Sequence, residues 1–497
     1  MDVLLALIPI ICIVILLLFF KKPLFAVAPF TYLITAVIAL LVWQMTYAYF
    51  LAASTRGLLI AIDISIIILG ALFFLQWLKS IGLLAQLEHV FTHLHPDKRV
   101  QAIILIWFLG SFIEGTAGFG TPAAIVAPLL VGLGFSPVLA VAMALVGNSA
   151  AVMFGAVGTP IRVGFESLQT EGVAQSAALI NALPAMLVPL FIIGMITYYH
   201  KQHKQEFFDM VPFALWSGFC FVACTYAVTF LGQEFPSLLG PLLAAGIVIY
   251  TTKKEWFTPK RVWKFTSTTL KQTLPLSYVI MPYVFVIGFL FLGRFTLQAY
   301  PIELFGVLVH KINTFNPGFA FFVAALLYSI IFSHQLKHMT QSVQHVGHII
   351  IKPFITILFI TGLVQIMMHS VHNMSGKISM IATIGSIIQH QSIVFFAPAI
   401  GAFGSFLSGS STVSNILFGA LQQDTALGLG ISVTLLLSLQ LIGSAVGNMI
   451  SLTNLVAAQA TVHLQNQEAT LLKLIAIPFL LYIVLAGLVG MIVHLLA

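Results

Sequence analysis

A glutamate in the middle of an otherwise apolar stretch is the first residue of this sequence that could do chemistry. Glu114 lies in "GSFIEGTAGFGTP", residues 110–122, between the apolar runs "AIILIWFL" and "AAIVAPLLV". An ionisable side chain in such surroundings usually has a function, and a carboxyl group there can take up and release a proton. The alternative is that Glu114 hydrogen-bonds the nearby backbone and never changes its charge. The four glycines, two threonines and one proline around it predict backbone that is not helical.

A second polar stretch, "GSFLSGSSTVSN" at residues 404–415, begins like the first and also interrupts an apolar run. Both stretches carry hydroxyls and amides, which can hydrogen-bond an anion. Each also supplies the N-terminus of a returning half-helix, from Thr121–Pro122 and from Ser414–Asn415, and helix N-termini attract anions. The two stretches therefore predict the binding of a small anionic solute beside a carboxyl group that carries a proton.

Two Gly-Asn pairs predict breaks in the helices that follow, at Gly147–Asn148 in "LVGN" and at Gly447–Asn448 in "AVGN". We expect the helix ends at these breaks to face the same site. Tight packing between helices is the alternative role for the small residues. The predicted substrate-binding residues are Gly115, Thr116, Gly118, Gly120, Thr121, Asn148, Ser408, Gly409, Ser410, Ser411, Thr412, Ser414, Asn415 and Asn448.

Asp63, in "GLLIAIDISIIILG", is the second candidate for proton coupling after Glu114. It either relays protons or pairs with a polar neighbour. Arg162 and Glu166, in "TPIRVGFE", are expected in a solvated loop rather than in a gate. Three histidine pairs have spacings that could suit a metal, but no cysteine or acid accompanies them. We expect them to be solvated: His334 and His338, His345 and His348, and His369 and His372.

The elements that position these residues must lie in a membrane. The 497 residues are 60% hydrophobic and 7% charged, with a mean hydropathy of +1.07, whereas soluble domains carry about a quarter charged residues. Apolar runs of about 20 residues recur without strand-like alternation, and the N-terminal run is expected to be a retained first span. The predicted fold is an all-α polytopic membrane protein with about twelve transmembrane helices, at 3–20, 24–46, 57–78, 136–157, 177–199, 209–232, 235–250, 273–293, 317–333, 347–369, 425–448 and 471–495.

Two further apolar stretches, 101–134 and 392–423, are split by their polar centres into halves too short to cross a membrane singly. We expect both to be re-entrant hairpins, because irregular backbone at membrane depth must be buried in protein or line a wet cavity. With hairpins, 15 of the 21 basic residues lie on one side of the membrane. The positive-inside rule makes that side cytoplasmic. Seven spans separate the hairpins, so the hairpins should open to opposite sides.

This arrangement predicts inverted repeats within a single membrane domain that covers residues 1–497. Repeat one is expected at about 24–199 and repeat two at about 317–495, with the substrate at the midplane between them. The basic run at 253–264, "KKEWFTPKRVWK", predicts a cytoplasmic loop that lies on anionic membrane lipid. The net charge of +7 needs no nucleic-acid partner to explain it.

The sequence contains no motif of an enzyme or of a cofactor site. It has no Walker loop, no dinucleotide-binding glycine fingerprint and no nucleophile elbow. The three cysteines all lie inside apolar runs, so they predict no disulfide framework. We therefore expect no cofactor, no metal and no enzymatic activity, and the oligomeric state stays open.

Four motifs stand in order along the chain: "EGTAGFGTPAAIVAPLLVGLGF", "ALVGNSAAVMFGAVGTPI", "GSFLSGSSTVSNILFGALQ" and "GNMIS". Together they closely resemble the L-lactate permease family of bacterial inner-membrane symporters. The resemblance implies proton-coupled symport of L-lactate across the cytoplasmic membrane, with glycolate, D-lactate and similar 2-hydroxy monocarboxylates as related substrates. It also implies a scaffold domain and a mobile domain with two hairpins, which move relative to each other like an elevator.

The chain departs from the family pattern at three places near the expected site. The family usually has an acid in the second hairpin, in "GSDTSSN", where this chain has Ser411. It usually has cysteine or alanine where Thr116 stands, and "ISPQ" where this chain reads "ISLTN" from Ile450. The missing acid leaves the coupling ion, its stoichiometry and the substrate open. A sodium-coupled carrier, or a carrier of another small anion, is therefore the alternative, and a membrane-embedded enzyme is a remoter one.

Overall fold

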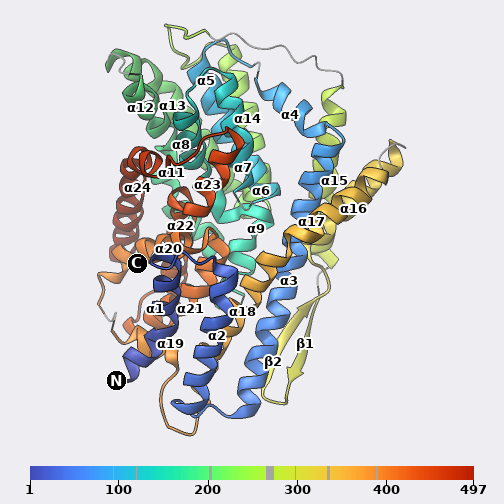
Figure 1. The fold of residues 1–497 in the computed structure, drawn as a ribbon. Helices are drawn as coiled ribbons and strands as arrows, with labels where there is room; N and C mark the ends of the chain where they lie inside the picture. Colours follow the sequence, from blue (N-terminus) through green and yellow to red (C-terminus); the bar gives the residue numbers. More distant parts are fainter. Residues whose placement is uncertain are drawn as a thin grey trace.

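The computed structural model of the protein describes residues 1–92, 94–118, 120–166, 168–200, 204–264, 274–296, 298–332, 336–387 and 390–496. Nearly all of its regular structure is helical (Figure 1). The first elements are α1 (Asp2–Leu18), α2 (Leu24–Leu41), α3 (Tyr47–Ser80), α4 (Leu83–Thr92), α5 (Lys98–Ile103), the π-helix η1 (Ile104–Leu109), α6 (Gly110–Thr116), α7 (Thr121–Gly132) and α8 (Pro137–Asn148).

A short 3-10 helix follows the end of α8, and the chain then continues in further helices. These are η2 (Ala151–Phe154), α9 (Gly155–Arg162), α10 (Val173–Ile180), α11 (Ala182–Met186), α12 (Val188–Tyr199), α13 (Lys204–Thr229), α14 (Pro236–Lys253) and α15 (Leu276–Thr296). The last part contains β1 (Ala299–Leu304), β2 (Leu308–Asn313), α16 (Pro317–Ile331), α17 (Leu336–Ile349), α18 (Ile351–His369), α19 (Met380–Gly385), α20 (Ile393–Ser408), α21 (Ser411–Leu429), α22 (Val433–Gly447), the 3-10 helix η3 (Asn448–Ile450), α23 (Leu452–Thr461) and α24 (Glu468–Leu496).

The all-α polytopic fold is confirmed. Among the described residues, eight helices are long and apolar enough to cross a membrane. One of them is Lys98–Thr116, so the first arm of the stretch 101–134 is longer than expected, because its helix begins at Lys98 and continues without a break to Thr116. The number rises to nine if the pair Pro137–Asn148 and Ala151–Arg162, bent by 53°, is one span. Other predicted spans correspond to shorter or broken apolar helices. The predicted span 317–333, for example, is the shorter helix α16, Pro317–Ile331.

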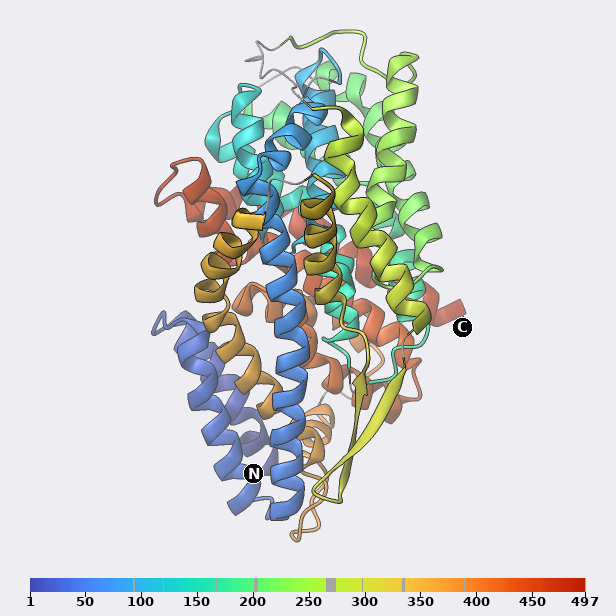
Figure 2. The same cartoon turned by 90° about the vertical axis from the view of Figure 1, so that its right-hand side faces the viewer.

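Several boundaries differ from the sequence prediction: α3, for example, begins at Tyr47 rather than at 57. The returning arm of the second hairpin does not end at 423, because α21 continues to Leu429 and stops at Gly430, whose φ of 66° is left-handed. The next helix therefore begins at Val433 rather than at 425. The β1–β2 hairpin was not predicted, and it lies beside α3 (Figure 2).

Hairpin one comprises α5, η1, α6 and α7, and hairpin two comprises α20 and α21. Glycines in the left-handed region turn the chain at both tips, with φ of 61° at Gly118, 76° at Gly120 and 73° at Gly409. A side chain at these positions would strain the backbone. The tips of both hairpins therefore require glycine there. Figure 1 places α5 near one end of the molecule and α19, which precedes hairpin two, near the other.

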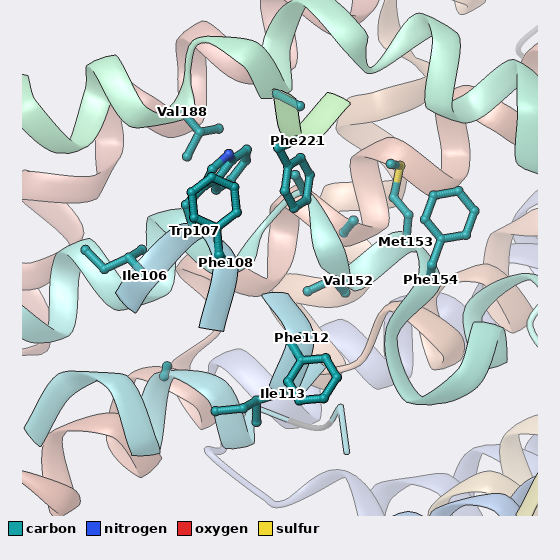
Figure 3. Packing of buried hydrophobic residues seen from close by; sticks show 14 of the residues in the cluster. Ile106, Trp107, Phe108, Phe112, Ile113, Val152, Met153, Phe154, Val188 and Phe221 are labelled. Atoms are coloured by element: carbon teal, nitrogen blue, oxygen red, sulfur yellow. The ribbon is translucent and has the colours of Figure 1, made fainter. Parts of the chain in front are cut away.

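Hairpin one is embedded in protein rather than exposed to lipid. Every residue from Arg99 to Thr116, the entering arm of the hairpin, is buried. Its aromatic side chains pack against neighbouring helices, and the ring centroids of Trp107 and Phe221 of α13 lie 4.3 Å apart (Figure 3). This burial meets the condition under which irregular backbone is tolerated at membrane depth.

Close backbone contact holds hairpin two against the helix break at Asn448. A Cβ atom on Gly443 would overlap the carbonyl of Pro398, and one on Gly447 would overlap the carbonyl of Ala402. Gly443 and Gly447 are four residues apart on α22, as in the small-xxx-small pattern of helix packing in membranes. The small residues of α22 therefore fix the position of α20.

A buried ionic cluster joins residues 97–99, the start of α13 and the loop after α14 at one end of the molecule. Arg99 is 1% exposed and donates to Asp97 Oδ2 at 2.8 Å and to Glu206 Oε2 at 3.0 Å. Trp263, from the loop after α14, donates its backbone N–H to Asp97 and its indole N–H to Glu206. These contacts hold the basic run at 253–264 against the starts of α5 and α13.

Candidate functional site

One cavity lies between the two hairpin tips and the two helix breaks. Its lining comes from four segments that are far apart in the sequence, so the predicted convergence of hairpins and breaks is present. The lining residues are Glu114, Gly118, Gly120, Asn148, Val152, Gly155, Ala156, Thr159, Pro160, Gly409, Ser410, Ser411, Thr412, Asn448 and Asn454.

Glu114 lies near the end of α6 and is 3% exposed. Its Oε2 accepts a hydrogen bond of 2.9 Å from Nδ2 of Asn148, the last residue of α8. Gly155 packs on the other carboxyl oxygen, because a Cβ atom on Gly155 would overlap Oε1. The carboxyl group is thus held by the first helix break on one side and by the start of α9 on the other.

The second helix break contributes a pair of asparagines. Asn454 of α23 donates from Nδ2 to Oδ1 of Asn448 at 2.8 Å, and both residues line the cavity. Ser411, at the position where the family usually has an acid, shares a hydrogen bond with the hydroxyl of Ser444 on α22. This side of the cavity therefore presents amides and hydroxyls and no carboxylate.

Helix N-termini contribute free backbone donors to the same place. The N-cap of α7 is Gly120, and no side chain caps this helix. At α21, the side chain of Ser410 accepts from the N–H of Val413, which satisfies one of the first-turn donors. Unpaired first-turn N–H groups together with the helix dipole favour an anion.

Glu114 is the sole charged side chain among the described residues that line the cavity. No lysine, arginine or histidine of this lining could neutralise a bound anion or the carboxylate itself. A buried charge without a partner is costly in a low-dielectric interior. The cavity is therefore suited to hold one negative charge and not two.

Sequence reasoning missed the turn that follows the first break. Ala156 and Val157 have left-handed φ values of 41° and 59°, and Gly158 follows with 76°. Such values are rare for residues other than glycine, and above all for a β-branched one. The turn packs on the tip of hairpin one, because a Cβ atom on Gly118 would lie 2.9 Å from Ala156 Cβ. The available signal was the tripeptide Gly-Thr-Pro, which occurs at 120–122 and again at 158–160.

The other lining residues that were missed lie close to predicted ones. Val152 belongs to η2, directly after the break at Asn148, and Thr159 and Pro160 follow the left-handed turn. Asn454 stands in "ISLTN", one of the places where this chain departs from the family pattern. That departure was the signal for a cavity residue.

Six predicted binding residues do not line the cavity. Four of them bond to backbone within their own hairpins: Thr116 to Ile113, Thr121 to Gly118, Ser408 to Gly404 and Ser410, and Ser414 to Gly401. Gly115 instead packs against the backbone of Ser237 on α14. Asn415 is fully buried and donates from Nδ2 to the carbonyl of Pro160 at 2.9 Å. These residues position the tips, and Asn415 ties hairpin two to the turn after the first break.

Asp63 lies on α3, away from the cavity lining. Its Oδ1 and its backbone carbonyl both accept hydrogen bonds of 2.8 Å from Nδ2 of Asn316, the N-cap of α16. Of the two alternatives for Asp63, the structure contains the pairing with a polar neighbour. A role in proton coupling stays untested for this residue.

The expectation of a solvated loop is wrong for Arg162 and Glu166. Arg162 is 11% exposed, donates to the carbonyl of Phe315 at 3.1 Å and lies 3.8 Å from Glu234. Glu166 lines a second cavity with residues of α3, α18 and α21. The physical reason is that the segment after α9 turns inward between these helices instead of leaving the helical bundle.

The histidine pairs give a mixed result. His345 and His348 are exposed on α17, as expected, although the segment is a helix and not a loop. His338 is partly buried, and His334 lies outside the described residues. His369 is also partly buried, with Nε2 3.4 Å from Arg56, and the exposed His372 stacks on Tyr49. No group of three or more His, Cys, Asp or Glu side chains in the described ranges could hold a metal ion.

The fold and the cavity define a class: a multi-pass membrane protein with a polar, single-carboxylate site enclosed by two hairpin tips and two broken helices. The model of the L-lactate permease family matches residues 2–303 and 296–497. The chain therefore belongs to the L-lactate permease family, and it is a multi-pass protein of the cell membrane.

Curated relatives agree with this family assignment. A putative L-lactate permease of Haemophilus influenzae is 29% identical over 88% of this chain and 88% of its own length. The L-lactate permease of Escherichia coli K12 is 28% identical over 94% of this chain and 91% of its own. The glycolate permease of the same organism is 27% identical, with 89% and 87% covered.

Proposed function

We propose that the protein is a secondary active transporter that carries L-lactate, or a similar small 2-hydroxy monocarboxylate, together with a proton. The relatives are named as permeases for L-lactate and glycolate, which are small 2-hydroxy monocarboxylates. The cavity offers amides, hydroxyls and helix N-termini of the kind that bind a carboxylate.

The observation that carries proton coupling is the charge of the cavity. Glu114 is the sole charged group of its described lining, so a bound anion meets either a neutral carboxylic acid or a second negative charge. Binding of the anion therefore favours protonation of Glu114, and protonation favours binding. Such reciprocity is what thermodynamic coupling of a proton to a substrate requires.

The proposed inverted repeats place the same elements on each side of the cavity. Each repeat supplies one hairpin tip and one helix that ends at a Gly-Asn pair and continues as a 3-10 turn, η2 or η3. In this proposal the repeats move relative to each other, so that the cavity opens alternately to one side of the membrane and to the other.

The test is flux into proteoliposomes that contain the purified protein. A pH gradient with the acidic side outside should drive accumulation of radiolabelled L-lactate in the vesicles, and a protonophore should abolish this accumulation. Driving by a sodium gradient instead would favour the sodium-coupled alternative. Conversion of L-lactate to another compound, without flux into the vesicles, would indicate an enzyme and not a transporter.

A further inference from the structure

The hydrogen bond between Asn148 and Glu114 has one unpaired end. Asn148 is 8% exposed and donates from Nδ2 to Glu114 Oε2 at 2.9 Å. Its Oδ1 is buried and accepts no hydrogen bond from any residue that the structure describes. A buried amide oxygen without a donor is unfavourable, so its presence beside the cavity needs a functional reason.

The charge of Glu114 dictates which end of the amide faces it. An ionised carboxylate only accepts hydrogen bonds, so it holds the Nδ2 end of Asn148 and leaves Oδ1 on the other side. The observed arrangement is this one. In this arrangement Asn148 has no N–H donor on the side of Oδ1. An anion on that side would meet the amide oxygen, which can only accept hydrogen bonds.

Protonation of Glu114 reverses the preference. A carboxylic acid has an O–H donor, which is best satisfied by Oδ1 of Asn148. The amide can accept from this O–H after a rotation of about 180° about χ2 of Asn148. For asparagine this torsion has a broad, roughly two-fold preference. The rotation exchanges two groups of nearly equal size, so the surrounding helices need not move. It presents the N–H donors of Nδ2 where Oδ1 stood before.

We propose that Asn148 is the coupling residue of this site: its side-chain amide flips when Glu114 is protonated and then donates to the carboxylate of the substrate. The proton enters from the aqueous side to which the site is open and binds Oε2 of Glu114. It leaves from the same atom on the opposite side, together with the anion. This inference rests on the proposed function and names the residue through which its coupling acts.

Among the described residues around Glu114, no other group would produce the same dependence on pH. The elements packed on α6 are η1, α7, α8, η2, α9, α14 and α15, where the ring of Tyr283 lies against Phe112. Their charged residues are Arg162, which lies beside Glu234, Lys253 at the far end of α14, and Arg294, about three turns beyond Tyr283 on α15. Ser237, near the start of α14, packs on Gly115, so Lys253 lies about 24 Å further along that helix. Hairpin two, η3 and α23 add only neutral residues to the cavity lining.

The test is the pH profile of L-lactate binding to the full chain, measured by calorimetry in lipid nanodiscs. The wild-type protein should bind more tightly at acidic than at alkaline pH. Asn148→Ala should weaken binding about 10- to 100-fold at acidic pH, the loss of a hydrogen bond to a charged group. At alkaline pH it should change the affinity by less than about twofold, because the amide offers no donor there.

Two further variants serve as controls. Ser149→Ala removes the next side chain, whose hydroxyl bonds only to the carbonyl of Val146 in its own helix, and should leave the profile unchanged. Glu114→Gln mimics the neutral acid, so its lactate affinity should not vary with pH. In that background, Asn148→Ala should weaken binding equally at both pH values.

Equal losses at both pH values in the Asn148→Ala single variant, or no loss at acidic pH, would overturn the coupling role. If Asn148→Ala does not fold, Asn148→Ser carries the test, because its short hydroxyl cannot bridge Glu114 and the substrate. A wild-type protein that binds no L-lactate, or binds it independently of pH, would overturn the proposed function itself. Normal wild-type behaviour with a normal Asn148 variant would overturn only this inference.

Discussion

A methyl group added at Gly155 should displace the carboxyl group of Glu114 without the substitution of any polar residue. Gly155 has φ −63° and ψ 156°, a conformation open to any residue, so alanine introduces no backbone strain. The new Cβ atom, however, would overlap Glu114 Oε1 and lie 3.2 Å from its Cδ. The carboxyl group must therefore move by about 1 Å to restore ordinary contact distances.

That shift is large enough to break the bond to Asn148. A bond of 2.9 Å lengthened by about 1 Å exceeds the hydrogen-bonding range. The lost interaction is worth about 1.5–3 kcal/mol, because one partner carries a charge. We expect Gly155→Ala to lower pH-driven lactate accumulation in proteoliposomes about 10- to 100-fold at subsaturating substrate.

Gly132→Ala is the matched control, because a Cβ atom on Gly132 at the end of α7 meets nothing within 4 Å. This variant should accumulate lactate like the wild-type protein. Glu114→Asp in the Gly155→Ala background shortens the acid by one methylene and should recover part of the activity. Unimpaired accumulation by Gly155→Ala, or a double variant no better than the single one, would refute this account of Glu114.

Three more predictions concern the site and its supports. Glu114→Gln should still exchange lactate across the membrane but fail to concentrate it under an imposed pH gradient, and full gradient-driven accumulation would exclude Glu114 as the proton carrier. Asn415→Ala removes the buried bond to the carbonyl of Pro160 and should reduce the free energy of unfolding by about 1–3 kcal/mol, measured by denaturation in detergent; an unchanged stability would contradict this. Arg99→Ala leaves the fully buried Asp97 without its cation and should cost about 3–5 kcal/mol, whereas substitution of the exposed Lys260 should not affect unfolding.

The sequence predicts the hairpin tips and the helix breaks because polar residues and glycines interrupt apolar runs there. Glycines and a carboxylate inside apolar runs cannot be explained by lipid-facing helices, so Glu114, Gly118 and Gly409 were found from composition alone. The same holds for Asn148 and Asn448, each preceded by glycine in a helix that would otherwise continue. All five line the cavity.

The sequence could not predict in the same way which side chains of the second hairpin tip point into the cavity. Ser411 and Thr412 line the cavity, whereas Ser414 and Asn415 point to α20 and to Pro160. Successive residues of a helix are rotated by about 100°. A run of polar residues such as this one therefore covers more than one face, and its rotation about the helix axis depends on packing against α20 and α22. Tertiary contacts decide it, and a single sequence does not contain them.

The left-handed turn at residues 155–158 was missed for a related reason. Local preference places Ala156 and Val157 in helix or strand and not at positive φ. Tertiary packing stabilises them there: the turn packs on Gly118, and Gly158 packs against the backbone of Gln233. Strained backbone of this kind is tolerated where the surrounding structure over-determines it, and such places are often functional.

The size of one electrostatic term explains why a single carboxylate is enough for the proposed coupling. Two negative charges about 4 Å apart repel by about 4 kcal/mol at an effective dielectric constant of about 20. This is about three decades in binding, and no cation of the described lining offsets it. An ionised Glu114 should therefore leave the cavity nearly empty of anion, and a neutral Glu114 should allow it to load. At the second tip, Ser411 is neutral and bonded to Ser444. The proposed symport therefore involves one proton for each monovalent anion, and the loaded site carries only the charge of the anion.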